Sequence, residues 1–202
     1  MTDSTPEAVV DDLQALVPVL FTAVEAGTQE AALFFEERDE PIDPYLFPNM
    51  VRWRARRELE RAEIDAVEDE ECSVDPRLAN NGILIKHRGY TLRLLKAGDN
   101  GDVPPPGPSK PRQSFYNQPL FGDTEFVNLV VVWTYRRDTR AVELELTCPK
   151  SADAYSNVSL HFRIVLEHPA IALPPAIAIG EPDADLTDLK LRVRPAELRP
   201  LG

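Results

Sequence analysis

Residues 128–147 constrain the fold more than any other stretch, because they specify two consecutive β-strands of different kinds. Residues 128–135 read Asn-Leu-Val-Val-Val-Trp-Thr-Tyr, an apolar and β-branched run typical of a strand buried on both faces. Residues 142–147 alternate between apolar and polar side chains and predict a half-buried strand. Its apolar side is Val142, Leu144 and Leu146, and its polar side is Glu143, Glu145 and Thr147. The short polar segment between the two strands predicts a hairpin.

The N-terminal part of the chain has apolar residues at helical spacing and predicts two or three helices. Residues 4–7 (Ser-Thr-Pro-Glu) have the pattern of a capping box, which should start the first helix. Pro18 should kink or break that helix, and Gly27 should end it. Thr28 should cap the next one.

A third helix should begin near Asp43-Pro44, with residues 50–67 as its firm part. Five arginines crowd its first turns beside Trp53, namely Arg52, Arg54, Arg56, Arg57 and Arg61. One interpretation is a contact with an anion or a nucleic acid. The interpretation that we favour is a solvated helix whose arginines pair with nearby acids, such as Glu36, Glu37, Asp39 and Glu40.

The net charge of −12 is concentrated at the front of the chain. Residues 1–76 hold 20 of the 34 acidic and 6 of the 22 basic residues, a charge of −14, so residues 77–202 carry +2. An acidic protein argues against bulk DNA binding, because phosphate contacts need a positive face. The ordinary composition, with 43% hydrophobic residues and no long apolar run, favours a protein without a membrane span.

Two cysteines, Cys72 and Cys148, are too few for a disulfide framework, and the acidic start does not resemble a signal peptide. Cytoplasmic residence is therefore expected. Arginine far outnumbers lysine, and alanine and proline are frequent, which is typical of a GC-rich bacterium. An apolar internal thiol is the expected state of Cys148, and the acids around Cys72 disfavour a reactive thiolate there.

From residue 80 onward the pattern changes to a period of two. Residues 83–87 and 90–96 predict a hairpin around Arg88-Gly89, residues 158–167 alternate as a further strand, and residues 189–194 predict a last short one. The predicted fold is α+β, with two or three N-terminal helices packed on one face of a mainly antiparallel sheet of five to seven strands. Residues 1–76 form an acidic helical part and residues 77–202 a β-rich part, expected to make one compact unit.

The segment 103–119 contains six prolines in seventeen residues and should lie extended on the surface, partly as polyproline II. Its C-terminal half gathers cations, aromatic rings and hydrogen-bond donors, and such long proline-rich loops are often functional. Cations beside aromatics suit a phosphate with a stacked base or an extended partner segment. The predicted ligand- or partner-binding residues are Arg93, Lys96, Ser109, Lys110, Arg112, Tyr116 and Gln118.

No motif in the sequence fixes a reaction, and no catalytic residue, metal site or cofactor is predicted. Asp138, Glu143 and Glu145 lie near Lys150, but the spacing differs from that of metal-dependent nucleases. The three histidines, His87, His161 and His168, have no ligand spacing and are expected to be hydrogen-bonded surface or rim residues. The glycine patterns of a phosphate loop, a nucleophile elbow and a dinucleotide site are missing.

Two functions remain open. The leading hypothesis is a cytoplasmic bacterial binding or accessory protein without catalysis of its own, which uses the proline-rich segment as its contact surface for a protein partner. The alternative is a protein that acts on a nucleotide or nucleic acid through a phosphate-binding loop, with a metal-dependent nuclease as one form of it.

Overall fold

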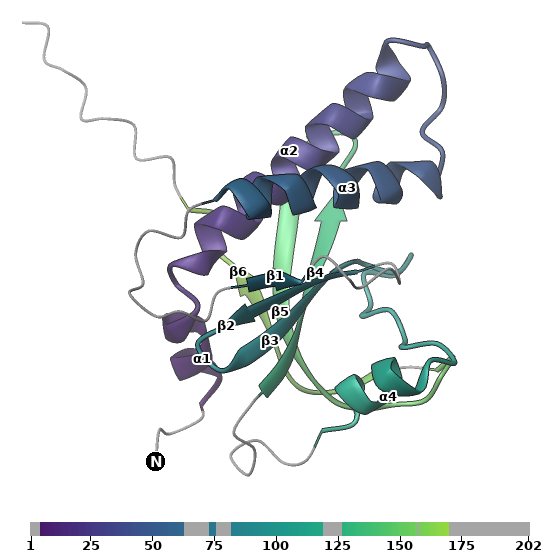
Figure 1. Cartoon of the computed structure of the whole chain (residues 1–202). Coiled ribbons are helices and arrows are strands. Elements are labelled where there is room, and N and C mark those ends of the chain that lie inside the picture. The colour runs from purple at the N-terminus through teal and green to yellow at the C-terminus, as the bar shows by residue number, and fades with distance from the viewer. Residues whose placement is uncertain (1–4, 63–72, 76–81, 119–126, 157, 170–202) are drawn as a thin grey trace, which may run out of the picture. The chain divides into compact units, whose positions relative to one another are not determined.

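The structure, a computed structural model, describes residues 5–62, 73–75, 82–118, 127–156 and 158–169. All of them belong to the first of two units, residues 1–169 (Figure 1). The predicted strand at 189–194 and the residue Cys72 lie outside the described residues.

The described strands form one six-stranded sheet in which spatial order follows chain order. The strands are β1 (Ser73–Asp75), β2 (Ile83–His87), β3 (Tyr90–Lys96), β4 (Val127–Tyr135), β5 (Val142–Ala152) and β6 (Val158–Leu166). Only β3 and β4 are parallel among these neighbours. The sheet follows three helices, α1 (Pro6–Asp12), α2 (Leu16–Glu36) and α3 (Leu46–Arg61), so the α+β prediction is confirmed.

The hairpin of β4 and β5 forms as predicted, and β4 is buried on both faces. Leu129, Val131 and Trp133 belong to one apolar cluster, and Val130 and Val132 belong to a second on the other face. The polar side of β5 differs from the expectation. Thr147 is fully buried, since its hydroxyl donates to the Val130 carbonyl at 3.0 Å and needs no water. The strand also continues well past Thr147, to Ala152.

The first helix begins within the predicted segment, but its cap is Thr5, whose side chain accepts from the Ala8 amide at 3.3 Å. Glu7 is then only two residues after the cap, so the predicted capping box, with a carboxylate three residues on, does not describe this helix start. The break comes at residues 13–15, before Pro18. Pro18 lies in the first turn of α2, where an amide has no helical partner, and is therefore tolerated.

Gly27 does not end a helix, and Thr28 does not begin one, contrary to the sequence prediction. Helix α2 runs through both residues to Glu36, and the Thr28 hydroxyl donates to the Glu25 carbonyl within the helix at 3.0 Å. The glycine is needed for packing instead. A β-carbon at Gly27 would lie 2.6 Å from the Val51 carbonyl oxygen of α3, so only glycine allows the two helices this close.

The third helix begins at Leu46, because the Asp43 carboxylate accepts from the amides of Tyr45 and Leu46, each at 2.7 Å. It therefore starts earlier than the predicted firm part, and its described end is Arg61. Residues 63–67 lie outside the described part of the chain.

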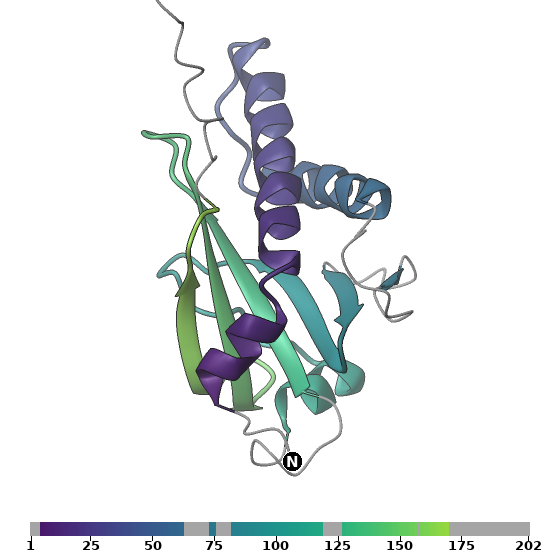
Figure 2. The same ribbon diagram turned by 90° about the vertical axis from the view of Figure 1, so that its left-hand side faces the viewer.

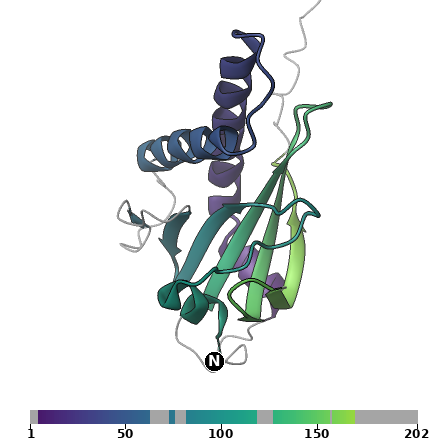
Figure 3. The same ribbon diagram turned by 90° about the vertical axis from the view of Figure 1, so that its right-hand side faces the viewer.

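The two faces of the sheet carry separate apolar clusters. On one face the main core joins α1, α2 and α3 to the sheet, with Leu16, Leu20, Phe21, Val24, Leu92, Leu94, Trp133, Leu144 and Leu146 among its members. On the opposite face a smaller cluster joins the sheet to residues 97–116, with Leu95, Val103, Tyr116, Val130, Val132 and Ala152 as its buried members. Figure 2 shows the face under α1 and α2, and Figure 3 the opposite face.

Strand β6 divides its apolar residues between these two clusters. Its pairing with β5 shifts register between Cys148 and Pro149 and again between Pro149 and Ser151. Val158, before both shifts, and Leu160, between them, pack on the smaller cluster, whereas Phe162 and Leu166, after them, pack on the main core. The edge strand thus contributes two apolar side chains to the face opposite the helices.

Candidate functional site

The proline-rich segment crosses the face of the sheet opposite α1–α3 and is the connection between the parallel strands β3 and β4 (Figure 3). The expectation of an extended segment holds only for its first half. Residues Lys110–Tyr116 form a helix, α4. The helix tolerates Pro111 because this residue falls in the first turn, where the missing amide costs no helical hydrogen bond. Extended chain with prolines therefore leads into one short helix.

Hydrogen bonds hold this segment to itself and to the end of β5. The Tyr116 hydroxyl donates to the Pro104 carbonyl at 2.9 Å, and its ring is fully buried. The Gly107 amide donates to the Ala154 carbonyl at 2.8 Å. The Asn117 side chain accepts from the Ala152 amide at 3.0 Å and donates to its carbonyl at 3.3 Å. The segment is thus fixed at several points along its length.

Gln118, one of the predicted binding residues, bridges strands β4 and β5. Its side-chain amide accepts from the Asn128 amide at 2.9 Å and donates to the carbonyls of Asn128 and Pro149, each at 2.7 Å. The first described β4–β5 partners are Val130 and Thr147. Gln118 therefore connects the two strands just beyond the end of their backbone pairing. Its side chain is committed to the fold.

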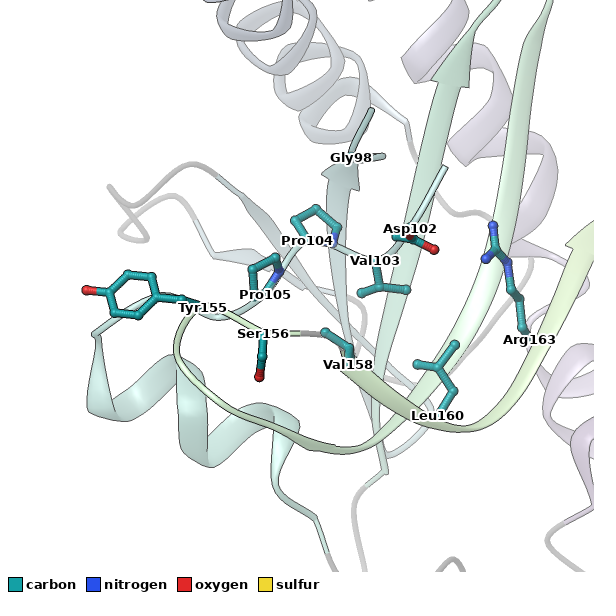
Figure 4. Close-up of a pocket in the computed structure, with 10 residues that line it drawn as sticks. All are labelled: Gly98, Asp102, Val103, Pro104, Pro105, Tyr155, Ser156, Val158, Leu160 and Arg163. Carbon is teal, nitrogen blue, oxygen red and sulfur yellow. The ribbon is translucent and has the colours of Figure 1, made fainter. Parts of the chain in front are cut away.

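A pocket of about 430 Å³ lies beside the proline-rich segment (Figure 4). One wall is Val103, Pro104 and Pro105, and the other is Tyr155, Val158 and Leu160, from the end of the β5–β6 connection and from β6. This volume is within the range of pockets that take a small ligand. The pocket therefore has apolar side chains on two walls that come from separate parts of the chain, within a lining that also includes polar residues.

Charged and polar groups lie at the rim of this pocket. The Arg163 guanidinium pairs with Glu145 and donates to the Gly101 carbonyl at 2.8 Å, which fixes the loop before the prolines against β6. Asp102 lies near Arg163 in Figure 4, and the Ser156 hydroxyl donates to the Asp153 carboxylate at 3.1 Å. The pocket walls are therefore held by contacts within the protein.

Two of the predicted site residues, Arg93 and Arg112, lie close to each other beyond this pocket. Arg93 is only 4% exposed although it is charged, and its guanidinium lies over the Phe115 ring, 5.4 Å from the centroid. The Nε atoms of Arg93 and of the half-buried Arg112 are buried and have no hydrogen-bond partner among the described residues. Burial lowers the pKa of Arg93, and the charge of Arg112 lowers it further.

The other predicted residues differ in accessibility. Lys96 and Lys110 are exposed, Ser109 is half-buried as the residue before α4, and Tyr116 is in the core. The structure thus brings Arg93, Arg112 and Tyr116 together, while the two lysines face solvent. Sequence reasoning missed Tyr155, Val158, Leu160 and Arg163, because nothing local marks these residues as neighbours of the prolines.

The arginines of α3 are mostly paired, as the interpretation that we favoured requires. Arg54 pairs with Glu30 and Glu58, Arg56 with Glu60, and Arg61 with Glu58. These acids differ from those that we named. Arg57 lies over the Trp53 ring, 4.8 Å from the centroid.

The acids considered for a nuclease are also engaged. Glu143 pairs with Arg136 at 2.7 Å, and Glu145 pairs with Arg163. His87 is buried rather than at the surface, and His168 pairs with Glu25 at 2.8 Å. The described residues hold no group of three or more His, Cys, Asp or Glu side chains placed to bind a metal ion.

Cys148 is buried in the main core, and burial raises the pKa of its thiol to about 12. We expect a Cys72→Ser variant to remain unlabelled by a thiol reagent at pH 8 while folded, and to react fully in denaturant. Since the folded pKa lies above the unfolded value of about 8.5, this group's contribution to stability is complete below that pH and is lost as pH rises toward 12. Native labelling as fast as that of the unfolded chain would contradict this placement.

Helices long and apolar enough to span a membrane are not found in the part of the chain that the structure describes. Comparison of the sequence and structure with family models, curated proteins and solved structures gives no significant match.

Proposed function

We propose that this chain is a cytoplasmic binding protein without catalysis of its own, and that it takes a protein partner at the proline-rich segment and its pocket. The observation that carries this proposal is the pocket of about 430 Å³ between that segment and β6, which has apolar side chains on both walls and polar groups at its rim. Apolar side chains of the partner would enter it.

The contacts around the pocket support binding because they order its walls in the free protein. Tyr116 fixes Pro104, Arg163 fixes Gly101, and the Gly107 amide fixes the turn at Ala154. A site whose walls are already ordered loses little conformational entropy when a partner binds.

The exposed residue at the mouth points to a protein partner. Tyr155 is 79% exposed beside the exposed Pro105, and aromatic residues are enriched in protein interfaces. The described lining residues include no histidine, and the Ser156 hydroxyl donates to the Asp153 carboxylate, so they hold no Ser–His pair of the kind that activates a nucleophile. This lining supports binding rather than group transfer.

The test is a native pull-down from the source cell with mass spectrometry, followed by binding of the purified partner to variants. We expect Tyr155→Ala to weaken that binding about thirtyfold, the effect of losing a hot-spot aromatic residue. A second variant, Leu160→Arg, places a charge in the pocket and should abolish binding.

Tyr45→Ala is the matched control, because Tyr45 is 82% exposed and precedes α3 on the other part of the structure. Binding should be unchanged in this variant. A partner that binds both pocket variants like the wild type would refute the proposal, as would recovery of a nucleotide and no protein.

A further inference from the structure

Arg93 and Arg112 form an unusual pair on the face of the sheet opposite the helices. Arg93 points from the middle of β3 toward α4, where Arg112 occupies the first turns. Among the described residues, no acidic side chain is paired with either of them, and the Nε of each is buried without a partner. Two positive charges therefore lie close together, each with an Nε–H donor that no described residue uses.

Such an arrangement is costly in a protein that needs Arg93 only for packing. A buried guanidinium without a counter-ion loses hydration, and the contact with the Phe115 ring returns only part of that cost. An apolar residue at this position would be expected to be as stable or more stable. The neighbouring residue on the same strand face, Leu95, shows that this face accepts apolar side chains. The Arg93 charge is therefore best explained by a partner that is not part of the described chain.

The donor geometry indicates the chemical class of that partner. A guanidinium presents Nε–H and terminal N–H groups in a fork that matches two oxygens of an oxyanion. Two adjacent guanidiniums carry +2 in total, which matches a phosphoryl group at neutral pH better than a carboxylate. The Phe115 ring supports the Arg93 guanidinium, and a β-carbon at Gly82 would lie 3.4 Å from its terminal nitrogen. The ring and the backbone thus hold this guanidinium in place.

We propose that Arg93 and Arg112 bind a phosphoryl group, as inorganic phosphate or as the end of a small phosphomonoester. Neither arginine lines the pocket of the proposed function, so this site does not depend on that proposal. Arg112 is half-buried and gives the anion access from solvent, while Arg93 is the deeper ligand.

The experiment is titration calorimetry and thermal unfolding of the full chain with inorganic phosphate at constant ionic strength. We expect saturable binding and a rise in Tm of roughly 5–10 °C at a hundredfold excess over Kd. Arg112→Gln and Arg93→Met should each weaken binding by about thirtyfold or more. Arg56→Gln, which alters a paired arginine on α3, should bind phosphate like the wild type.

Unfolding without phosphate separates a ligand-binding role from a structural one. Arg93→Met should then unfold at the same temperature as the wild type or higher, and phosphate should raise only the wild-type value. A lower Tm for Arg93→Met in phosphate-free buffer would indicate that Arg93 stabilises the fold by itself, and would overturn the proposal.

Two further ligands identify the source of the phosphoryl group and test its class. Tighter binding of adenosine monophosphate than of phosphate would identify a nucleotide ligand, and equal binding would identify the phosphoryl group alone. Absence of saturable phosphate binding, equal binding by all variants, or binding of acetate as tight as that of phosphate would overturn the assignment.

Discussion

Gly27→Leu is expected to destabilise the protein by about 3 kcal/mol or more, among the largest effects that a single substitution causes. A β-carbon at this position would lie 2.6 Å from the carbonyl oxygen of Val51 and 3.1 Å from its Cα. Both atoms belong to the backbone of α3, so they can move only if the two helices separate. Separation would loosen the core that α2 and α3 share around Val24 and Val51. Unfolding in urea, monitored by circular dichroism, measures the loss in the free energy of unfolding.

Whether Gly27→Ala raises or lowers the free energy of unfolding is a stricter test of this close helix contact. In an ordinary helix interior this change stabilises by about 1 kcal/mol, because alanine is the better helix former. Here we expect a net loss of about 1–2 kcal/mol in the free energy of unfolding, since the clash with α3 costs more than the higher helix propensity of alanine contributes. Gly98→Ala is the control, because the nearest atom to its new β-carbon is 3.5 Å away, and its stability should change little. A stabilised Gly27→Ala protein would show that α2 and α3 are farther apart than described.

The difference between Gly27 as predicted and as found shows where sequence patterns reach their limit. A glycine in a helical pattern indicates either a helix end or a close approach of two backbones, and only the position of α3 decides between them. Strands β4 and β5 were predictable because the pattern of apolar residues that identifies each of them lies within a short stretch of sequence. The burial of Thr147 was not predictable, because it depends on the Val130 carbonyl across the sheet.

The candidate site likewise has features that the sequence predicts and features that depend on the fold. The sequence marked the proline-rich segment and the cations within it, and the structure places Arg93 and Arg112 together there. It could not indicate that Tyr155 and Leu160 form the other wall of the pocket, because that wall depends on how β6 pairs with β5. It also could not tell that the polar side chains of Tyr116 and Gln118 are used within the fold.

Gln118→Leu should destabilise the protein by about 2–4 kcal/mol. The wild-type side chain satisfies three backbone groups, the amide and carbonyl of Asn128 and the carbonyl of Pro149. Leucine has a similar volume but no polar atom, and each partly buried group left without a partner costs about 1–3 kcal/mol, less where water can enter. Equilibrium unfolding in urea measures the change, with Gln29→Leu on the exposed surface of α2 as the control of matched chemistry.

Gln118→Glu separates lost hydrogen bonds from lost packing, because glutamate keeps the shape and changes only the donors. A carboxylate can still accept from the Asn128 amide, but it faces the carbonyl oxygens of Asn128 and Pro149, which repel it. The folded protein should therefore favour the protonated acid, whose pKa is then raised above the unfolded value of about 4.3. Its contribution to stability is complete below that value and is lost as pH rises, so this variant should approach wild-type stability near pH 4 and fall behind it near pH 7. A deficit that does not change with pH would mean that the Gln118 amide is not bonded to these carbonyls.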